Sequence, residues 1–408
     1  VIKLAHILFH LANYSYLCNM MKHTTAIILT ILCLFPASLA AQEQQTTGIA
    51  DKIKSVFSSS IKIGSYTFRD GAVYTGELKS HKPNGKGKTT FPTGDIYEGE
   101  YVKGKRQGIG TYIFTDGEKY EGEWFQDQQH GHGIYYFQNN NRYDGMWYQD
   151  FQQGSGTMYY YTGDVYEGQW DHDLREGMGS YTWRNGAKYQ GQWHADKKEG
   201  QGSFTWNDGS SYVGSWKADL REGIGTFNFT NGDKYVGEWH NDMQHGKGIY
   251  TFHTGDRYEG SYQNGERTGS GVYFYANGNK YVGEFQNGMQ EGQGTFTWEN
   301  GAVYEGQWHE NMRHGKGTYK WNVGDSYEGE WSNNEFNGEG TLIQTDGTRY
   351  KGQFVNGMEE GHGVRIDKTG TRYEGTFKQG KKEGEFTETD SAGNVRTIIY
   401  HNDRILSQ

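Results

Sequence analysis

Proline and cysteine are nearly absent from this chain, which has three prolines and two cysteines in 408 residues. So little proline, without a three-residue glycine period, excludes a collagen-like triple helix. Both cysteines, Cys18 and Cys33, come before residue 41. No disulfide framework is therefore expected in the remainder of the chain.

Glycine and aromatic residues are abundant instead: the chain has 62 glycines, 32 tyrosines, 20 phenylalanines and 12 tryptophans. Long helices are not expected, because each glycine costs about 1 kcal/mol inside a helix. A polar, aliphatic-poor chain is ordinarily disordered. The aromatic side chains argue against disorder here, because each can bury roughly 150–250 Å². An all-β fold with many turns is predicted.

Residues 21–40 have the pattern of a secretory signal peptide. A charged start is followed by an apolar run from Ala26 to Phe35 and by small residues up to Ala40. The run is short for a permanent membrane span, so cleavage after Ala40 is expected. Residues 1–20 are interpreted as an over-extended gene start, with a signal anchor as the alternative. An exported protein is predicted, whether periplasmic, on the outer surface or secreted.

The net charge favours some partners over others. It is −10 at pH 7, and removal of residues 1–40 takes away Lys3 and Lys22, which makes it −12. Such an acidic chain is a poor match for nucleic acid or for an anionic lipid surface. Neither nucleic acid nor membrane lipid is therefore expected as a partner.

The most informative feature is an internal repeat with a period of 23 residues. The tripeptide Tyr-x-Gly occurs fourteen times in one phase, with no insertion or deletion. A fixed period of this length indicates a repeat protein, in which neighbouring units stack on one another. The repeat tyrosines are Tyr74, Tyr97, Tyr120, Tyr143, Tyr166, Tyr189, Tyr212, Tyr235, Tyr258, Tyr281, Tyr304, Tyr327, Tyr350 and Tyr373.

Other positions keep the same phase. A Gly-x-Gly pair follows each tyrosine at offsets 11 and 13, except that Phe386 replaces the last glycine. At offset 7 stands a residue that tolerates left-handed backbone, and His81 is the exception. Three residues before each tyrosine stands glycine, and Asn140 is the exception. Four residues after the tyrosine stands a large apolar residue, which in eight copies is a tryptophan: Trp124, Trp147, Trp170, Trp193, Trp216, Trp239, Trp308 and Trp331.

These offsets predict one β-hairpin per repeat. Tyr120, Gly122 and Trp124 share parity along a strand, and so do Gly108 and Gly110 in the returning segment, so rings and glycines lie on one face. The predicted fold is all-β, an elongated single-layer antiparallel meander of 14 hairpins over residues 64–386. Residues 41–63 are interpreted as a linker or N-terminal cap and residues 387–408 as a C-terminal cap. A propeller is less favoured, because its blades need a period of about 40–50 residues.

The unit running from Tyr235-Val-Gly-Glu-Trp239 to His245-Gly-Lys-Gly248 resembles the MORN repeat family. This resemblance covers residues 64–386 and implies a scaffold or a self-associating rod. Some similar arrays are attached to a catalytic domain, but the flanking segments here are too short for one. The resemblance thus implies no enzyme activity and no cofactor.

Residues that could carry chemistry follow the repeat. Lys86-Gly87-Lys88-Thr89 lacks the upstream glycine of a phosphate-binding loop. His130, His245 and His314 precede the glycine pair in separate repeats and cannot converge on one metal ion. The carboxylates that recur on the other face are interpreted as a solvated ladder: Glu98, Glu100, Glu121, Glu123, Glu328 and Glu330. No catalytic, metal or cofactor site is predicted.

The tryptophan stripe is the candidate interaction site. The eight tryptophans are interpreted either as core or as the floor of a groove that holds a partner, because exposed aromatic surface marks interfaces. The predicted function is a non-enzymatic, exported scaffold that binds a protein partner or forms a homodimer. The alternative is an envelope-glycan-binding module that uses the same aromatic groove.

Overall fold

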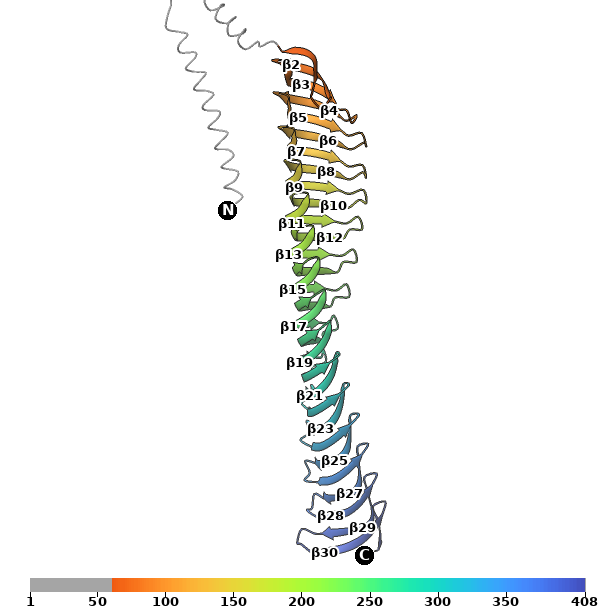
Figure 1. Cartoon of the computed structure of the whole chain (residues 1–408). Coiled ribbons are helices and arrows are strands. Elements are labelled where there is room, and N and C mark those ends of the chain that lie inside the picture. Colours follow the sequence, from red (N-terminus) through yellow and green to blue (C-terminus); the bar gives the residue numbers. More distant parts are fainter. Residues whose placement is uncertain (1–60, 408) are drawn as a thin grey trace, which may run out of the picture. The chain divides into compact units, whose positions relative to one another are not determined.

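The computed structural model describes residues 61–407, and this part of the chain contains β-strands and turns but no helix (Figure 1). The predicted all-β class is confirmed. The chain divides into two compact units, Val1–Arg106 and Gln107–Gln408. The extension at 1–20, the signal peptide at 21–40 and most of the linker at 41–63 lie outside the described residues.

The first unit contains β1 to β4, and β5 begins at the boundary between the units. The strands of the first unit pair antiparallel in chain order, with Gly64 opposite Gly76 and Gly87 opposite Gly99. Their bounds are β1 Lys62–Thr67, β2 Val73–Lys79, β3 Lys82–Thr90 and β4 Ile96–Val102.

In the second unit, each strand from β6 to β30 pairs antiparallel with the strand before it and the strand after it, which makes a meander in a single layer. Seven-residue strands alternate with nine-residue strands, and each seven-residue strand from β6 to β28 carries a repeat tyrosine at its second position. The bounds are β5 Lys105–Ile113, β6 Lys119–Phe125, β7 Gln128–Tyr136, β8 Arg142–Tyr148, β9 Phe151–Tyr159, β10 Val165–Asp171, β11 Leu174–Thr182, β12 Lys188–His194, β13 Lys197–Thr205, β14 Ser211–Lys217, β15 Leu220–Asn228, β16 Lys234–His240, β17 Met243–Thr251, β18 Arg257–Gln263, β19 Glu266–Phe274, β20 Lys280–Gln286, β21 Met289–Thr297, β22 Val303–His309, β23 Met312–Lys320, β24 Ser326–Ser332, β25 Glu335–Ile343, β26 Arg349–Val355, β27 Met358–Ile366, β28 Arg372–Lys378, β29 Lys381–Thr389, β30 Val395–His401 and β31 Arg404–Ser407.

Two kinds of turn join the strands, and both use left-handed backbone as the sequence predicted. The turn between β6 and β7 has two residues with positive φ, Gln126 at 50° and Asp127 at 75°. Such two-residue turns match the twist of the strands they connect. In the longer turn, Asn140 has a φ of 63° where the other repeats have glycine. The exception to the glycine pattern therefore keeps its backbone conformation.

The Gly-x-Gly pair is used differently from the prediction, which gave both glycines to ring packing. Gly122 lies opposite Gly133, yet the next residue, Glu123, lies opposite His130. The intervening segment is a β-bulge at Gly131, whose φ is 56°. The first glycine thus supplies left-handed backbone at the bulge, and only the second leaves room for a ring.

The C-terminal segment, interpreted from the sequence as a cap, contributes two further strands. β30 includes Val395, Ile398 and Tyr400 and pairs with β29, where Phe386 takes the place of the second glycine. The Phe386 ring packs edge-on between Phe377 and Tyr400, at centroid distances of 5.1 and 5.5 Å. A further short strand, β31, pairs with β30.

Candidate functional site

The ring face is the face of the sheet that carries the repeat tyrosines and the tryptophans four residues after them. Each tyrosine from Tyr74 to Tyr327 is fully buried. Its hydroxyl donates a hydrogen bond to the carbonyl three residues later, as in Tyr212 to Ser215 at 3.0 Å. Burial raises the pKa of Tyr212 to about 12. The phenol therefore stays neutral and acts as a structural donor.

Glycine is required beneath each of these rings. A Cβ built on Gly225 would lie 2.3 Å from the Tyr212 hydroxyl oxygen, and one on Gly214 would lie 2.5 Å from the Gly225 Cα. Neither neighbour can move away, because one is a buried ring and the other is backbone. The prediction that rings and glycines share one face is confirmed, and the glycines leave room for the ring against the neighbouring strand.

The tryptophans of the predicted groove lie in the core of the ring face. All eight are 3–6% exposed, and each indole N–H donates to the carbonyl of the glycine fourteen residues earlier at 3.1–3.4 Å. Their rings meet two repeat tyrosines edge-on, as Trp216 meets Tyr212 at 5.2 Å and Tyr189 at 5.5 Å. The alternating rings form a continuous ladder. These eight residues are Trp124, Trp147, Trp170, Trp193, Trp216, Trp239, Trp308 and Trp331.

A second series of aromatic residues is more accessible, and the sequence prediction of the site left it out. We call it the outer ring row; it stands seventeen residues after the repeat tyrosine, where the nine-residue strand ends. Its members are partly buried and were detectable from the same 23-residue period. In the second unit they are Phe114, Phe137, Tyr160, Trp183, Trp206, Phe229, Phe252, Tyr275, Trp298 and Trp321.

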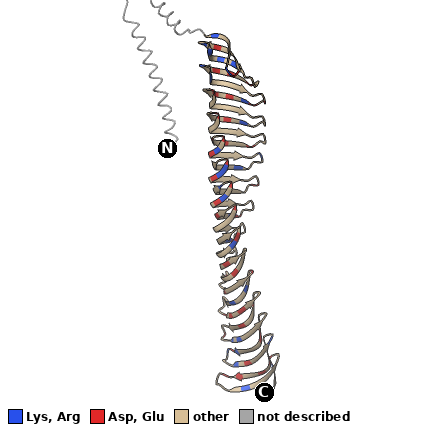
Figure 2. Cartoon of the chain, viewed as in Figure 1, with Lys and Arg blue, Asp and Glu red and all other residues tan. Residues whose placement is uncertain are grey.

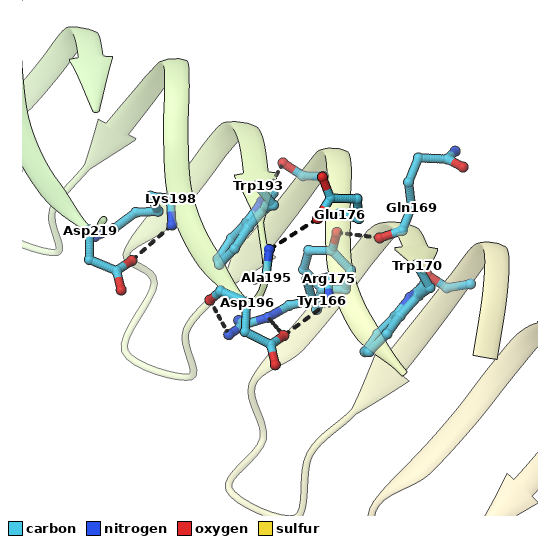
Figure 3. A network of polar contacts seen from close by, with 12 residues as sticks. Tyr166, Gln169, Trp170, Arg175, Glu176, Trp193, Ala195, Asp196, Lys198 and Asp219 are labelled. Carbon is cyan, nitrogen blue, oxygen red and sulfur yellow. Dashed lines mark hydrogen bonds and ion pairs between the residues drawn. The ribbon is translucent and has the colours of Figure 1, made fainter. Parts of the chain in front are cut away.

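Long cationic side chains cover several tryptophans from above. The guanidinium carbon of Arg175 lies 4.3 Å from the Trp193 ring centroid, and its nitrogens donate to the Asp196 carboxylate at 2.9 Å and to the Asp196 carbonyl at 2.8 Å (Figure 3). Lys198 lies 4.4 Å from the Trp216 centroid. Burial lowers the pKa of Lys198. Cation–π contacts of this kind stabilise the covered ring by about 0.5–2 kcal/mol.

Two neighbouring repeats have glutamine at the position of these cations, and a groove opens there. Gln129 and Gln152 are shorter than arginine or lysine, and both are buried. Met158 lines the same groove and stands where the neighbouring repeats have Tyr135 and Tyr181. The resulting groove has a volume of about 590 Å³ and is lined by Phe114, Gln129, Tyr135, Phe137, Trp147, Asp150, Gln152, Met158, Tyr160, Trp170, Asp173, Arg175 and Asp196.

One rim of this groove is acidic. One carboxylate oxygen of Asp150 accepts the Gln129 backbone N–H at 2.7 Å, and Asp173 does the same for Gln152. Asp196 pairs with Arg175. The carboxylates are therefore held in place by the backbone of the preceding repeat, one per repeat, beside an aromatic floor.

The other side of the sheet, called here the opposite face, is mainly polar, and both charge signs occur along the strands of the second unit (Figure 2). The predicted carboxylate ladder lies on it and has a local role. The Glu123 carboxylate accepts the His132 backbone N–H at 3.0 Å, and the Glu238 carboxylate accepts that of Lys247 at 2.8 Å. These N–H groups belong to the bulge, so the carboxylates satisfy donors there.

The three histidines considered as metal ligands lie in separate environments. His130 packs between Phe125 and Tyr148, whereas His245 packs on His240 and His314 on His309. Between residues 61 and 407, no group of three or more His, Cys, Asp or Glu side chains could hold a metal ion.

The segment that superficially resembles a phosphate loop lies within strand β3. Its Thr89 is buried and shares a hydrogen bond with the Tyr101 hydroxyl at 2.5 Å. The described part of the chain contains no helix that is long and apolar enough to span a bilayer.

The family model named MORN repeat matches this chain fourteen times in succession, from residue 74 to residue 390. Each match is in the register of one repeat tyrosine. The chain therefore belongs to the MORN repeat family, as the sequence predicted. No curated protein matches the chain.

Solved structures with some similarity include the SAS-4 TCP domain of Drosophila melanogaster bound to a proline-rich motif of Ana2. It is 14% identical over 38% of this chain and 85% of that one, with a TM-score of 0.25. The TCP10 domain of Danio rerio CPAP with a STIL peptide is 10% identical over 66% and 99%, with a TM-score of 0.24. A streptogramin B lyase is 13% identical over 78% and 95%, with a TM-score of 0.12.

Proposed function

We propose that this protein is an exported, non-enzymatic scaffold whose ring-face groove binds an extended polypeptide with basic side chains. The observation that supports this proposal is the groove above Gln129 and Gln152, where two adjacent repeats both have glutamine in place of a covering cation such as Arg175. Aromatic side chains line its floor, and carboxylates line one rim. Aromatic residues are enriched at protein interfaces.

The spacing of the repeats suits an extended ligand that runs along the stack of strands. Two strands at about 4.8 Å each advance about 9.6 Å per repeat. A polyproline II helix advances about 9.3 Å per turn of three residues. Such a segment presents the same side of each turn to successive repeats, so each third residue meets one ring and one carboxylate.

The charge of the rim selects a basic ligand over an acidic one. Asp150, Asp173 and Asp196 recur at intervals of one repeat, and Arg175, the basic residue that lines the groove, is already paired with Asp196. A basic side chain at every third position of the ligand would face one of these carboxylates. Complementary charges favour the correct partner and speed association.

A peptide of six Pro-Pro-Arg units tests this proposal, with six Pro-Pro-Glu units as its charge control. We expect the basic peptide to bind and the acidic peptide not to bind in isothermal titration calorimetry. Gln152→Arg should abolish binding by filling the groove, whereas Gln244→Arg, the same change outside the groove, should not. Binding of both peptides, or of neither, would contradict the proposal.

The glycan alternative makes a distinct prediction. An uncharged cell-wall glycan would stack on rings and would be retained equally by the wild type and by an Asp150→Asn, Asp173→Asn variant. We expect no glycan retention, and a twofold to fivefold weaker binding of the basic peptide by that variant, about the effect of an exposed ion pair. Glycan retention that Gln152→Arg removes would favour the alternative.

Export is proposed from the signal-peptide pattern at residues 21–40. N-terminal sequencing of the protein recovered outside the cytoplasm should begin at Ala41. Recovery of only uncleaved chain in the cytoplasm would contradict this part of the proposal and leave the groove unaffected.

A further inference from the structure

The opposite face departs from the repeat pattern in the middle of the second unit. In most repeats the residue after the repeat tyrosine is acidic, as in Glu121, Glu167, Glu305 and Glu328. Between β14 and β20, valine or isoleucine predominates along the central row of this face. The members of this apolar row are Val213, Val236, Ile249, Val272 and Val282.

Strand register places these residues side by side. Val236 lies directly opposite Ile249, and Val272 lies directly opposite Val282. Val213 continues the row through Thr226, and Glu259 separates Ile249 from Val272. The row is therefore continuous over seven strands apart from one threonine and one glutamate.

The apolar row is accessible rather than part of the core. Val213 is 56% exposed, Val236 37%, Ile249 39% and Val282 42%. Val236, Ile249, Val272 and Val282 line a shallow groove of about 810 Å³. Exposed apolar side chains that gather in one place on an otherwise polar surface mark interaction sites.

Charged residues flank the apolar row in an ordered way. Lys234, Val236 and Glu238 follow one another on this face of β16, and Lys280, Val282 and Glu284 do the same on β20. These two strands are the only ones of the chain with the sequence Lys-Tyr-Val-Gly-Glu. One flank is thus basic, because Arg257 of β18 adds to it, whereas the other carries Glu238 and Glu284, with Lys247 of β17 between them.

We propose that the apolar row is the interface through which two copies of the chain associate face to face. A two-fold axis that runs along the stack of strands brings each strand over its own copy in the opposite direction. Lys234 then faces the second copy's Glu238, and Lys280 faces the second copy's Glu284. Such an interface is isologous and satisfies each contact twice.

Charge selects this orientation over the other two-fold arrangement. An axis parallel to the strands at β18 would bring Lys234 against the second copy's Lys280, and Glu238 against its Glu284. Like charges brought together in this way disfavour association. Packed sheets with nearly aligned strands are also a common arrangement.

The area of the apolar row and its flanks determines how strongly the two copies are expected to associate. Seven strands, β14 to β20, at about 4.8 Å spacing and five residues of about 3.4 Å cover roughly 570 Å². A stable interface of standard size buries about 800 Å² per partner. Glu259, which is ion-paired to Arg257 on its own strand, meets its counterpart near the axis. The dimer is therefore weak and concentration-dependent.

A charge-exchange experiment with the full chain tests the interface by sedimentation equilibrium over a concentration series. We expect the wild type to dimerise reversibly. One variant carries Lys234→Glu and Lys280→Glu, and the other carries Glu238→Lys and Glu284→Lys; each alone should lose association by more than about tenfold. An equimolar mixture should dimerise, because each acidic flank then meets a basic one.

Two further variants separate the interface from effects on folding. Glu259→Val should tighten the dimer by removing two facing carboxylates. Ile109→Lys, at a 61% exposed site of the opposite face outside the apolar row, should leave association unchanged. A monomeric wild type at all concentrations would overturn the proposal. So would a dimer that none of the charge variants weakens, since association would then use another surface.

Discussion

The two faces of the sheet in the second unit share one backbone but differ in how freely their residues vary. On the ring face, the position of Tyr212 is tyrosine in every repeat, because its ring fills the space above two glycines and its hydroxyl has a fixed acceptor. On the opposite face, the residue after the repeat tyrosine is Glu121 in one repeat, Val213 in another and Lys351 in a third. Close packing restricts the tyrosine position to one residue type, whereas the solvent-exposed position after it accepts residues of different size and charge.

This difference separates what builds the fold from what distinguishes one stretch of it from another. The ladder of tyrosines and tryptophans is nearly the same from repeat to repeat, so it cannot by itself confer a local function. Local character comes from the residues that cover the ladder, such as Gln152 in place of Arg221, and from those on the opposite face. Four substitutions test this separation.

The largest effect is expected from Trp216→Ala on the ring face. Removal of a nearly buried indole that contacts Tyr189 and Tyr212 should lower the free energy of unfolding by about 3–5 kcal/mol. Ile224→Ala, on the opposite face, should change it by less than about 0.5 kcal/mol. Urea unfolding followed by tryptophan fluorescence measures both, and a similar loss in the two variants would remove the distinction between the faces.

Gly225→Ala should also destabilise the ring face. The added methyl group would overlap the Tyr212 hydroxyl, and overpacking of this kind costs about 1–3 kcal/mol. Hydrogen exchange of the β14 to β16 amides should accelerate accordingly. Thr226→Ala, the next residue but on the opposite face, is the matched control; equal acceleration there would show that the glycine has no special role.

Arg221→Gln should convert a covered repeat into one that resembles the open groove. The change removes the Arg221 guanidinium from the Trp239 ring, 4.2 Å away, and its hydrogen bond to Asp242. We expect a loss of about 0.5–2 kcal/mol in stability, the range of a cation–π contact. Increased quenching of tryptophan fluorescence by acrylamide would show the opening, and unchanged quenching would contradict it.

The smallest effect concerns a surface pair at the edge of the sheet. The hydrogen bond that His194 donates to the Glu176 carboxylate raises the pKa of His194, whereas the Ala195 backbone N–H and His194 lower the pKa of Glu176. Because the pKa of His194 is raised in the folded protein, its protonation stabilises the fold fully below pH 6.5. This stabilisation is lost as the pH rises through the raised pKa. Because the pKa of Glu176 is lowered in the folded protein, its ionised form stabilises the fold fully above pH 4.5. This stabilisation is lost as the pH falls through the lowered pKa.

The Glu176–His194 contact should therefore be strongest between the ordinary values of 4.5 and 6.5. NMR titration should give His194 a pKa above 6.5, and Glu176→Gln should bring it back toward that value. A His194 pKa that Glu176→Gln leaves unchanged would contradict the assigned cause.

Much of the hairpin geometry was predictable, because each repeat contains its own local signals. Asn140 was expected to take a left-handed conformation and does so. The bulge at Gly131 was not expected, because a glycine two residues before another suggests a shared packing role unless the register of the partner strand is known. The outer ring row was missed as a site because its rings occur at the strand ends, where parity along the strand says little about accessibility.

The role of the eight tryptophans also could not be predicted without the strand register. Sequence parity placed all eight tryptophans on one face, and they lie there. Whether they were core or binding surface depended on Arg175 and its equivalents, which stand on a different strand and reach across from the neighbouring repeat. A contact between residues 18 positions apart cannot be read from a repeat motif until the strand register is known.

By itself, the sequence determined the period, the hairpins, the family and the face to which each ring belongs. These depend on local backbone preferences and on an unbroken spacing of 23 residues. Only the tertiary structure decided which rings are covered, where the groove opens and that Val236 and Val282 join one apolar row. Those features depend on strand register across several repeats, which brings together residues that no single repeat contains.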